Sequence, residues 1–530
     1  MGRFTKIFRN TIALSAFAFV AGVSTSRGAP FTGVLHRPPS APPAVPREFR
    51  AAWMTPIWDR GFKDWPTSPN MTPDEQRAEL RRMLDQAVAA GLNAVILHVR
   101  LAGDALYPTS YAPWSVVLTG KSGVGPQPSY DPLRFAIDEA HARGLQLHAW
   151  FNPFRAMLPQ FAGKAAPNHV TRTHPEWIRK YGSQTWIDPG EPAARTFVLE
   201  TILDVVKRYD VDGVHLDDYF YPYRESRTVT RRVHRRRVRQ SVEIPFPDDK
   251  TWKKYGRSEG YADRDAWRRD NIDQFIQLLY QNVKAIKPAV VVGISPFGIW
   301  RPGHPPGIAG LDAYAEIYAD SRRWLQNGWL DYLAPQLYWE IGGTQDRFRL
   351  LDAWWRSENV RGRHVWPALY TSHVYGGRDA WPMGEIARQV EAIRASRIGT
   401  ADVPGHVHFR LAALFADNMR LANTLANDYR ERALVPAFPW LGAAAPAAPR
   451  VSLVTNGGAA AFLVEPGDAN TPRWWLIQTR GRDGAWRTNV RLSTDTKFTA
   501  AALGTADADE IAVSAISPTG IASEPAIVVP

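Results

Sequence analysis

The sequence of 530 residues contains no cysteine. This absence excludes disulfide bonds, thiolate metal sites, iron–sulfur clusters and cysteine nucleophiles. Any chemistry therefore has to come from carboxylates, His, Ser, Lys, Tyr or Arg. The glycine-rich fingerprints of nucleotide-binding folds are also missing. We expect an activity that needs no cofactor.

A hydrophobic run long enough to cross a membrane is missing at the N-terminus. The apolar stretch Thr11–Val23 has 13 residues, whereas a membrane span needs about 20. Basic residues precede it and small residues follow it as far as Ala29, which is the pattern of a secretory signal peptide. We predict that residues 1–29 are a signal peptide and that the protein is exported to the periplasm or cell envelope. Once the signal is removed, we expect no integral membrane association.

Acidic residues are in the minority, with 52 Asp and Glu against 64 Lys and Arg, which gives a net charge of +12. Such a balance favours an anionic partner, and export makes nucleic acid an unsuitable one. Aromatic residues make up 12% of the chain and include 21 Trp. Exposed aromatic rings are the usual platforms for the flat apolar faces of sugar rings. We expect an anionic polysaccharide partner and no nucleic acid.

Composition and hydrophobic pattern divide the rest of the chain into four segments. A proline-rich stretch at 30–46 is predicted to be an extended linker. From 47 to 435, short apolar runs alternate with amphipathic helical patterns, which indicates βα units and a parallel sheet. A Pro/Ala linker at 436–450 leads to short alternating strands at 451–530. These strands predict a β-sandwich of the fibronectin type III kind.

Eight strands are predicted in the segment 47–435, and eight is the number that closes a TIM barrel. They are Phe49–Met54, Ala94–Arg100, Leu145–Asn152, Gly213–Tyr219, Val290–Phe297, Tyr332–Glu340, Val365–Thr371 and Val407–Leu414. The predicted fold class is therefore α/β, a (β/α)8 TIM barrel with a C-terminal fibronectin type III-like β-sandwich. We expect the sandwich to pack against the barrel rather than to bind glycan through Trp474, Trp475 or Trp486.

Polar side chains concentrate at the carboxyl ends of the predicted strands, where the sites of TIM barrels lie. Strand residues alternate between two faces, so apolar positions that face the helices send their neighbours inward. The inward positions are His98, Arg100, His148, Trp150, Asn152, His215, Asp217, Gln336, Tyr338 and Glu340, with Asp218 and Tyr219 at the rim. A barrel end with a purely structural role needs no such concentration.

Carboxylates in an aromatic, polar cleft fit glycoside hydrolysis. One carboxyl group gives a proton to the leaving oxygen, while an ionised one attacks the anomeric carbon or activates water. Asp217 is predicted to be the nucleophile or base. Asp218 and Glu340 rank nearly equal as the general acid, because adjacent strand-end residues point to different sides and a partner across the barrel fits the required separation. A structural role for Asp218, as a helix cap or an arginine partner, stays open.

Three inward histidines offer an alternative chemistry. His98, His148 and His215 on consecutive strands could hold a metal ion that activates water. The HxH pair usual on the first strand of such barrels is absent, and hydrogen bonding explains inward histidines equally well. We therefore predict no bound metal and keep a metal-dependent barrel hydrolase as the alternative.

Several long motifs resemble those of one family. They are REFRAAWMTP, HVRLAGDALYPTSYAPWS, LQLHAWFNPFRA, DVDGVHLDDYFYPY, RRDNIDQFIQLLYQNVKAIKP, GISPFGIWRP and WLDYLAPQLYWEIG. Over about residues 47–435 the sequence resembles the glycosyl-hydrolase-10-like family. The resemblance implies a TIM barrel with glycosidase activity, frequently exported. The best-understood relatives in Gram-negative bacteria are similar to a division-site enzyme that cuts peptidoglycan glycan strands already stripped of their stem peptides.

The resemblance also implies a set of cleft residues. Carried over by position, they are Arg100, Asp104, Asn152, Arg155, Asp217, Asp218, Gln336 and Tyr338. Removal of the stem peptide leaves a carboxylate on each muramic acid, which Arg100 and Arg155 could bind in bidentate fashion. The sequence departs from the family pattern at 224–239, a segment with eight arginines. This segment either captures anionic glycan or is a solvated basic segment without a ligand.

The sequence therefore predicts an exported glycosidase that cleaves a bacterial cell-wall polysaccharide, with peptide-free peptidoglycan strands as the first candidate substrate. The rival from another class is a non-catalytic glycan-binding envelope protein. The predicted substrate-binding residues are His98, Arg100, Asp104, Trp150, Asn152, Arg155, His215, Tyr219, Gln336 and Tyr338.

Overall fold

The computed structural model describes residues 40–233, 236–397, 399, 402–442, 444–456, 459–505 and 508–530. The predicted signal peptide and most of the proline-rich linker lie outside the described residues. Residues 41–530 form one compact unit. Within the described part of the chain, we find no helix whose length and apolar character would let it span a membrane.

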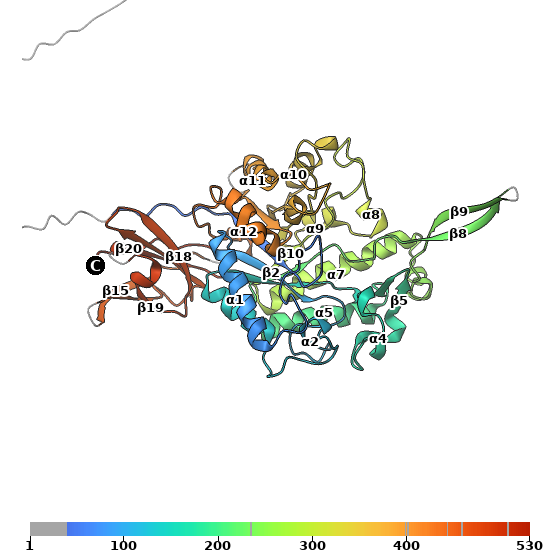
Figure 1. Ribbon diagram of the computed structural model, residues 1–530, viewed down its shortest axis with the longest axis horizontal. Coiled ribbons are helices and arrows are strands. Elements are labelled where there is room, and N and C mark those ends of the chain that lie inside the picture. The colour runs from blue at the N-terminus through green and yellow to red at the C-terminus, as the bar shows by residue number, and fades with distance from the viewer. Residues whose placement is uncertain are drawn as a thin grey trace, which may run out of the picture. The chain divides into compact units, whose positions relative to one another are not determined.

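A parallel sheet of nine strands forms the centre of the unit (Figure 1). Its strands are β1 (Phe49–Met54), β2 (Ala94–Arg100), β3 (Gln146–Phe151), β7 (Gly213–Leu216), β10 (Val291–Ile294), β11 (Tyr332–Leu333), β12 (His364–Val365), β13 (Ala368–Leu369) and β14 (Gly405–His408). They lie in the order β12-β11-β10-β7-β3-β2-β1-β14-β13. The two end strands, β12 and β13, follow each other in the chain, so one short stretch of backbone belongs to both ends of the sheet.

Each of the eight predicted strand segments contains a strand, and the first two have the predicted bounds. The later strands are shorter than predicted. Regular pairing of β11 ends at Leu333, shortly before Pro335. Pro367, which has no N–H to donate, lies between β12 and β13. The predicted eighth strand is wrong beyond His408, because α12 begins at Leu411.

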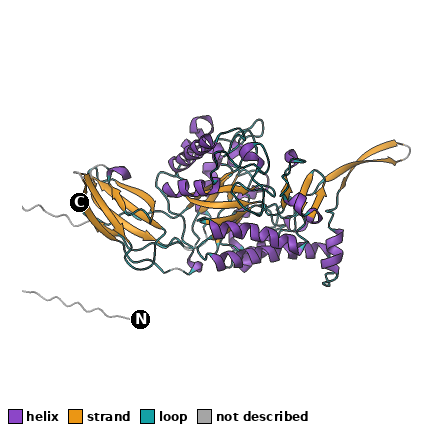
Figure 2. Ribbon diagram, turned by 90° about the horizontal axis from the view of Figure 1, so that it is seen from below, coloured by secondary structure: helices purple, strands orange, loops and turns teal. Residues whose placement is uncertain are grey.

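Helices surround the sheet, as Figure 2 shows. They are α1 (Pro73–Ala89), α2 (Val116–Thr119), α3 (Pro132–Ala142), α4 (Val170–Thr173), α5 (Pro192–Arg208), α6 (Asp249–Thr251), α7 (Arg264–Ile286), α8 (Ala313–Glu316), α9 (Ser321–Asn327), α10 (Arg347–Ser357), α11 (Glu385–Ala395) and α12 (Leu411–Leu425). Local sequence sets their ends. Before α1, the Thr72 side chain accepts from the Glu75 N–H and the Glu75 carboxylate accepts from the Thr72 N–H, a capping box.

The two faces of the sheet divide its side chains as the alternation predicts. Val95, Leu97 and Val99 pack in the apolar layer beneath the helices. Ala94 and Ile96 of the same strand pack with Phe49, Trp53 and other side chains on the opposite, inner face. The inner face is therefore filled by side chains near the amino ends of the strands, and the polar residues that follow lie at the carboxyl ends.

Two smaller β-structures lie in the loops that follow β3 and β7. One is a three-stranded antiparallel sheet of β4 (Arg155–Met157), β6 (Gln184–Ile187) and β5 (Ile178–Tyr181). The other is the hairpin of β8 (Ser226–Val233) and β9 (Arg236–Glu243), which projects away from the helices in Figures 1 and 2. This hairpin is the form that the arginine-rich segment takes.

The C-terminal segment forms two antiparallel sheets. One contains β15 (Arg450–Asn456), β16 (Ala459–Glu465) and β19 (Lys497–Thr499), and the other contains β18 (Trp486–Leu492), β17 (Trp474–Gly481), β20 (Ala508–Ile516) and β21 (Ala526–Val528). Side chains from both sheets share one apolar core around Trp475, which is fully buried. Trp474 is also buried and packs beside Leu434, so neither of these rings is open to a sugar.

Candidate active site

A cavity of about 330 Å³ opens at the carboxyl ends of the parallel strands. Its volume falls in the range of small-molecule sites. The lining residues come from β1 and the loop after it, from β2, β3 and β4, and from the segments after β7, β10, β11 and β14. They are Trp53, Thr55, Ile57, Asp59, His98, Trp150, Asn152, Arg155, Asp217, Asp218, Tyr219, Tyr223, Phe297, Gln336, Tyr338 and Phe409.

Asp217 and Asp218 both line this cavity, and each is 4% exposed. The sequence predicted that the two side chains would point to different sides; they do have different neighbours, Asn152 for Asp217 and Tyr223 for Asp218, yet both border the same cavity. Strand β7 ends at Leu216, so the strict alternation of strand residues no longer applies to the two aspartates. The strand end thus delivers two neighbouring carboxyl groups to one hollow.

The two carboxyl groups have different environments. Burial, together with the charge of Asp218, raises the pKa of Asp217 to about 7. Burial also raises the pKa of Asp218, but hydrogen bonds from the Tyr223 hydroxyl and the Gln336 side chain oppose that rise. The donors at Asp218 favour its anion, and with a pKa of about 7 Asp217 is still partly protonated at neutral pH. Two neighbouring buried carboxyl groups resist ionising together, which favours one acid beside one anion.

A chain of hydrogen bonds positions Asp217. The Asn152 Nδ2 donates to Asp217 Oδ2 over 2.7 Å and lies 3.0 Å from His98 Nε2. His98 Nδ1 in turn lies 2.9 Å from Thr55 Oγ1. Because an amide nitrogen only donates, His98 accepts at Nε2 and donates from Nδ1. Burial lowers the pKa of His98 well below its ordinary value, so this ring is neutral and holds Asn152 in place.

Aromatic rings and a guanidinium complete the walls. The Arg155 guanidinium lies 3.7 Å above the Tyr219 ring, and the Trp150 ring stacks on His98 at 3.7 Å between centroids. Trp150 Nε1, Asn152 Oδ1 and Arg155 Nε are buried and make no hydrogen bond within the described protein. Buried polar groups normally have partners, so these three atoms are free to bind the hydroxyl or carboxylate groups of a ligand.

Glu340 is not brought to the cavity, and the prediction that it faces Asp217 across the barrel is wrong. Its side chain is 39% exposed and lies 3.8 Å from Arg388. Because regular pairing of β11 ends at Leu333, the inward alternation cannot be extended seven residues further. Gln336 and Tyr338, closer to the strand, do line the cavity as predicted.

Two other predicted cleft residues lie outside the cavity lining. Arg100 is fully buried, and the register of β2 against β3 shifts between His98 and Arg100. Such an irregularity re-aims the side chains that follow it. Asp104 is 8% exposed and accepts a hydrogen bond from the Ala102 N–H rather than facing the carboxylate pair.

The histidines do not form a metal site. His215 lies beneath the cavity, where its ring nitrogens contact Trp53 Nε1 at 3.1 Å and the Tyr332 hydroxyl at 2.8 Å. The same hydroxyl lies 2.9 Å from His148 Nδ1. His98 is held by Thr55 and Asn152, as described above. Among the described residues, no group of three His or carboxylate side chains is placed to hold a metal ion. The alternative prediction, a metal ion held by His98, His148 and His215, is therefore wrong.

The sequence analysis did not identify several residues that line the cavity. Trp53, Thr55, Ile57 and Asp59 come from β1 and the loop after it, at alternate positions. The alternation rule, applied to the first strand, would have found Trp53, whereas Thr55, Ile57 and Asp59 lie beyond the end of the strand. Asp59 is a third carboxylate of the cavity, and it accepts hydrogen bonds from the Tyr370 and Ser372 hydroxyls. Tyr223 lies in a loop, where no periodicity marks it, whereas Phe297 and Phe409 lie within two of the predicted strands but were not named as site residues.

A cavity with two buried carboxyl groups, aromatic walls and unpaired polar atoms fits a hydrolase that cleaves glycosidic bonds. Comparison with known sequences agrees, because the model of the family "Glycosyl hydrolase-like 10" matches residues 48–373. The chain belongs to this family, and the protein is a glycosidase.

Two similar proteins are themselves named glycosyl hydrolases. Glycosyl hydrolase YngK of Bacillus subtilis is 38% identical over 428 residues, which cover 77% of each chain. Glycosyl hydrolase DigH of Escherichia coli is 36% identical over 339 residues, 60% of this chain and 72% of its own. Among solved structures, the PgaB (BpsB) glycoside hydrolase domain of Bordetella bronchiseptica aligns with a TM-score of 0.43 and 15% identity. That alignment covers 71% of this chain and 98% of that one.

Proposed function

We propose that the protein is an exported glycoside hydrolase of the periplasm or cell envelope that cleaves glycosidic bonds of peptide-free peptidoglycan strands. We further propose that its catalytic part is a (β/α)8 barrel and its C-terminal part a fibronectin type III-like sandwich. The bridge Phe297 to Gln336 continues the pairing of β10 with β11, and the bridge Gln336 to Ala368 links the segment after β11 to β13 at the other end of the sheet, which supports closure of the barrel.

The observation that carries the proposal is the buried pair Asp217 and Asp218 in a sugar-sized cavity. With a pKa of about 7, Asp217 holds the proton that the leaving oxygen needs. Asp218, which receives hydrogen bonds from Tyr223 and Gln336, provides the negative charge. We therefore assign the general acid to Asp217 and the anionic role to Asp218, the reverse of the roles that the sequence suggested.

The chemistry of the cavity supports a carbohydrate that carries carboxylates. Trp58, between two lining residues, is 69% exposed, which suits stacking on a sugar ring near the entrance. Arg155 Nε is unpaired at the cavity wall, and a guanidinium binds a carboxylate with charge-assisted hydrogen bonds. Peptide-free peptidoglycan offers both features, because each muramic acid carries a free lactyl carboxylate. The signal-peptide pattern and the net charge of +12 agree with an anionic substrate outside the cytoplasm.

The test is incubation of the purified protein with peptide-free glycan strands, followed by measurement of new reducing ends. We expect cleavage of these strands and much slower cleavage of strands that keep their stem peptides. A protein that releases no reducing ends from peptide-free strands, but cleaves another polysaccharide, contradicts the proposed substrate.

A further inference from the structure

We propose that the hairpin β8–β9 is a binding arm for the anionic polysaccharide that extends beyond the cavity, whose carboxylates its arginines bind. This inference rests on the proposed function, since it assumes that a polymer occupies the site. It concerns the part of the polymer that the cavity is too small to hold.

The hairpin begins at the cavity itself. Tyr223 lines the cavity, and its hydroxyl donates to Asp218. Arg224 follows directly, and β8 starts at Ser226. A strand of eight residues extends about 26 Å at 3.3 Å per residue. A polymer that leaves the carboxylate pair on this side therefore meets the arm immediately.

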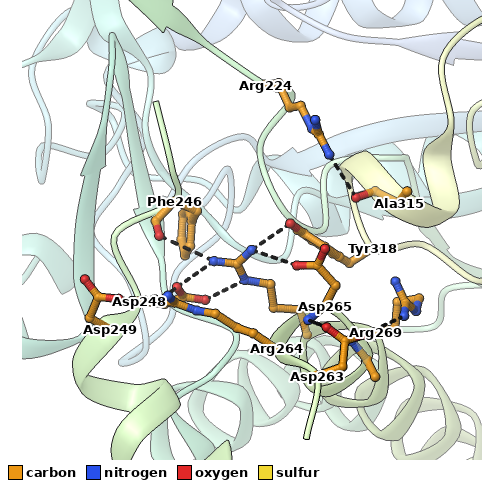
Figure 3. A network of polar contacts seen from close by, with 12 residues as sticks. Arg224, Phe246, Asp248, Asp249, Asp263, Arg264, Asp265, Arg269, Ala315 and Tyr318 are labelled. Atoms are coloured by element: carbon orange, nitrogen blue, oxygen red, sulfur yellow. Dashed lines mark hydrogen bonds and ion pairs between the residues drawn. The ribbon is translucent and has the colours of Figure 1, made fainter. Parts of the chain in front are cut away.

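The root of the hairpin is held by polar contacts, several of which Figure 3 shows. Arg224 pairs with Glu243 of the returning strand over 2.9 Å and donates to the Ala315 carbonyl. The chain after β9 continues to Phe246 and Asp248. Arg268 donates there to the Phe246 carbonyl, to both Asp248 oxygens and to the Tyr318 hydroxyl. These bonds fix the base of the arm next to the cavity.

The strands of the arm present cations that have no ion-pair partner among the described residues. Arg227, Arg237 and Arg239 are exposed, and no ion pair joins them to the described residues. The two carboxylates between Arg224 and the end of β9 are engaged at the root. Glu225 accepts from the Ser183 N–H and hydroxyl, and Glu243 pairs with Arg224. Unneutralised charges on an isolated ribbon repel one another, and an anionic ligand relieves that repulsion.

The arrangement of these cations favours a polymer over a membrane. Arg227 pairs with Val242 and Arg239 with Thr230, so alternation places Arg227 on one face of the ribbon and Arg237 and Arg239 on the other. A flat lipid surface uses one face only, whereas a flexible chain can pass along both. The strands also contain no Trp, Tyr or Phe, the residues that anchor segments at a membrane interface.

The test compares two variants of the full chain, each with three arginines replaced. The arm variant is Arg227→Ser, Arg237→Ser and Arg239→Ser. The matched control is Arg82→Ser, Arg397→Ser and Arg430→Ser, which removes the same charge from exposed positions elsewhere. Both sets are combined with Asp217→Asn, so that equilibrium binding of labelled glycan is measured without cleavage. Unchanged thermal unfolding shows that the variants keep the fold.

Three ligands separate the interpretations: long peptide-free strands, a fragment just long enough to fill the cavity, and long strands whose carboxylates have been reduced to alcohols. The arm variant is expected to bind long strands about tenfold more weakly than the parent does. It should bind the fragment and the reduced strands with the same affinity as the parent. The control is expected to bind all three like the parent. The parent protein should also prefer long strands to their reduced form, and this preference should be smaller in the arm variant.

Equal binding of long strands by the parent and the arm variant would overturn the proposal, as would an equal loss in the control. It is also overturned if the arm variant binds glycan normally but no longer binds anionic vesicles or duplex DNA that the parent binds. If wild-type protein cleaves no peptide-free strand, the proposed function fails, while the binding comparison still decides whether the arm holds anionic glycan.

Discussion

At the scale of single residues, the site depends on the contrast between two adjacent aspartates. Asp217 receives one donor from Asn152 and a weaker one from the Tyr219 N–H, and it is buried beside another carboxyl group. Asp218 receives the Tyr223 hydroxyl and the Gln336 side chain. The donors at Asp218 favour its anion, whereas the charge of Asp218 favours the protonated form of Asp217.

Replacement of Asp217 by Asn removes the proton donor but keeps the shape of the side chain. We expect turnover to fall by at least about 100-fold while glycan binding changes little, because general acid catalysis contributes factors of that order. Reducing-end release and equilibrium binding are the measurements. A variant that keeps a substantial part of its activity removes Asp217 from the role of acid.

The same substitution should stabilise the protein in alkaline solution. The folded pKa of Asp217, about 7, is above the ordinary value of 3.8, so the carboxyl group costs stability once pH rises above the unfolded pKa, increasingly up to about pH 7. Asn carries no such cost. We expect the free energy of unfolding of Asp217→Asn at pH 8 to exceed that of the wild type by up to about 4 kcal/mol, and the gain to vanish near pH 4. Urea unfolding at both pH values measures it, and a pH-independent difference contradicts the raised pKa.

Tyr223→Phe removes the hydroxyl that stabilises the Asp218 anion. The pKa of Asp218 should then rise, and the acid limb of the pH–rate profile should move to higher pH by about one unit. Tyr107→Phe is the matched control, because its buried hydroxyl has no hydrogen-bond partner among the described residues and lies outside the cavity lining. An acid limb that stays in place in Tyr223→Phe would show that Asp218 does not depend on this bond.

At the scale of elements, the sequence predicted the parallel strands well because buried β-strands have a strong apolar pattern. His98, Trp150, Asn152, Asp217, Gln336 and Tyr338 were placed correctly, since they lie on or just beyond regular strands. The errors lie where regular pairing stops. Glu340 follows β11 by seven residues, and Arg100 follows a register shift, and neither interruption is visible in an apolar pattern. Asp59 and Tyr223 lie in loops whose course depends on tertiary contacts.

The end of the last parallel strand is tied to the loop after the first by a buried ion pair. Arg410 Nε donates to Asp64 Oδ2 over 2.7 Å, and both side chains are fully buried. Arg410 also donates to the carbonyls of Phe62 and Thr55, and Thr55 lines the cavity. These bonds hold one wall of the site to the sheet.

Arg410→Met is expected to lower the free energy of unfolding by about 3–5 kcal/mol, because it leaves Asp64 buried without a cation. The double variant Arg410→Met with Asp64→Leu should recover much of that loss. Arg420→Met, which breaks the exposed pair with Asp417, should cost less than about 1 kcal/mol. Urea unfolding distinguishes the three. An equal loss in the single and double variants would mean that the uncompensated charge is not the cause.

At the scale of the whole molecule, the C-terminal sheets are joined to the amino ends of the parallel strands. Arg473, just before β17, pairs with Asp210 over 2.7 Å and with Asp212 over 3.0 Å. Burial acts to raise the pKa of Asp212, but His141 and Arg473 outweigh it and hold the pKa well below its usual range. This cluster lies before β7, whereas the cavity lies after it, so stability and catalysis are served by opposite ends of the same strand.

Arg473→Ala should therefore destabilise the protein without changing the chemistry of the site. We expect a loss of about 1–3 kcal/mol at pH 7, since Asp212 keeps a buried charge with one partner fewer. A depressed pKa contributes stability above the unfolded pKa and loses it as pH falls, so the difference from wild type should shrink below about pH 4. Arg450→Ala, which removes an exposed pair with Glu465, is the control. Loss of glycosidase activity in Arg473→Ala without loss of stability would contradict this separation.

The most direct test of the site is the pH dependence of reducing-end release from peptide-free glycan strands by the wild-type protein. If Asp217 gives the proton, the rate falls as pH rises through about 7, and Asp217→Asn releases almost no ends at any pH. A wild-type rate that stays constant from about pH 6 to about pH 9, or a comparable rate in the variant, contradicts the assignment.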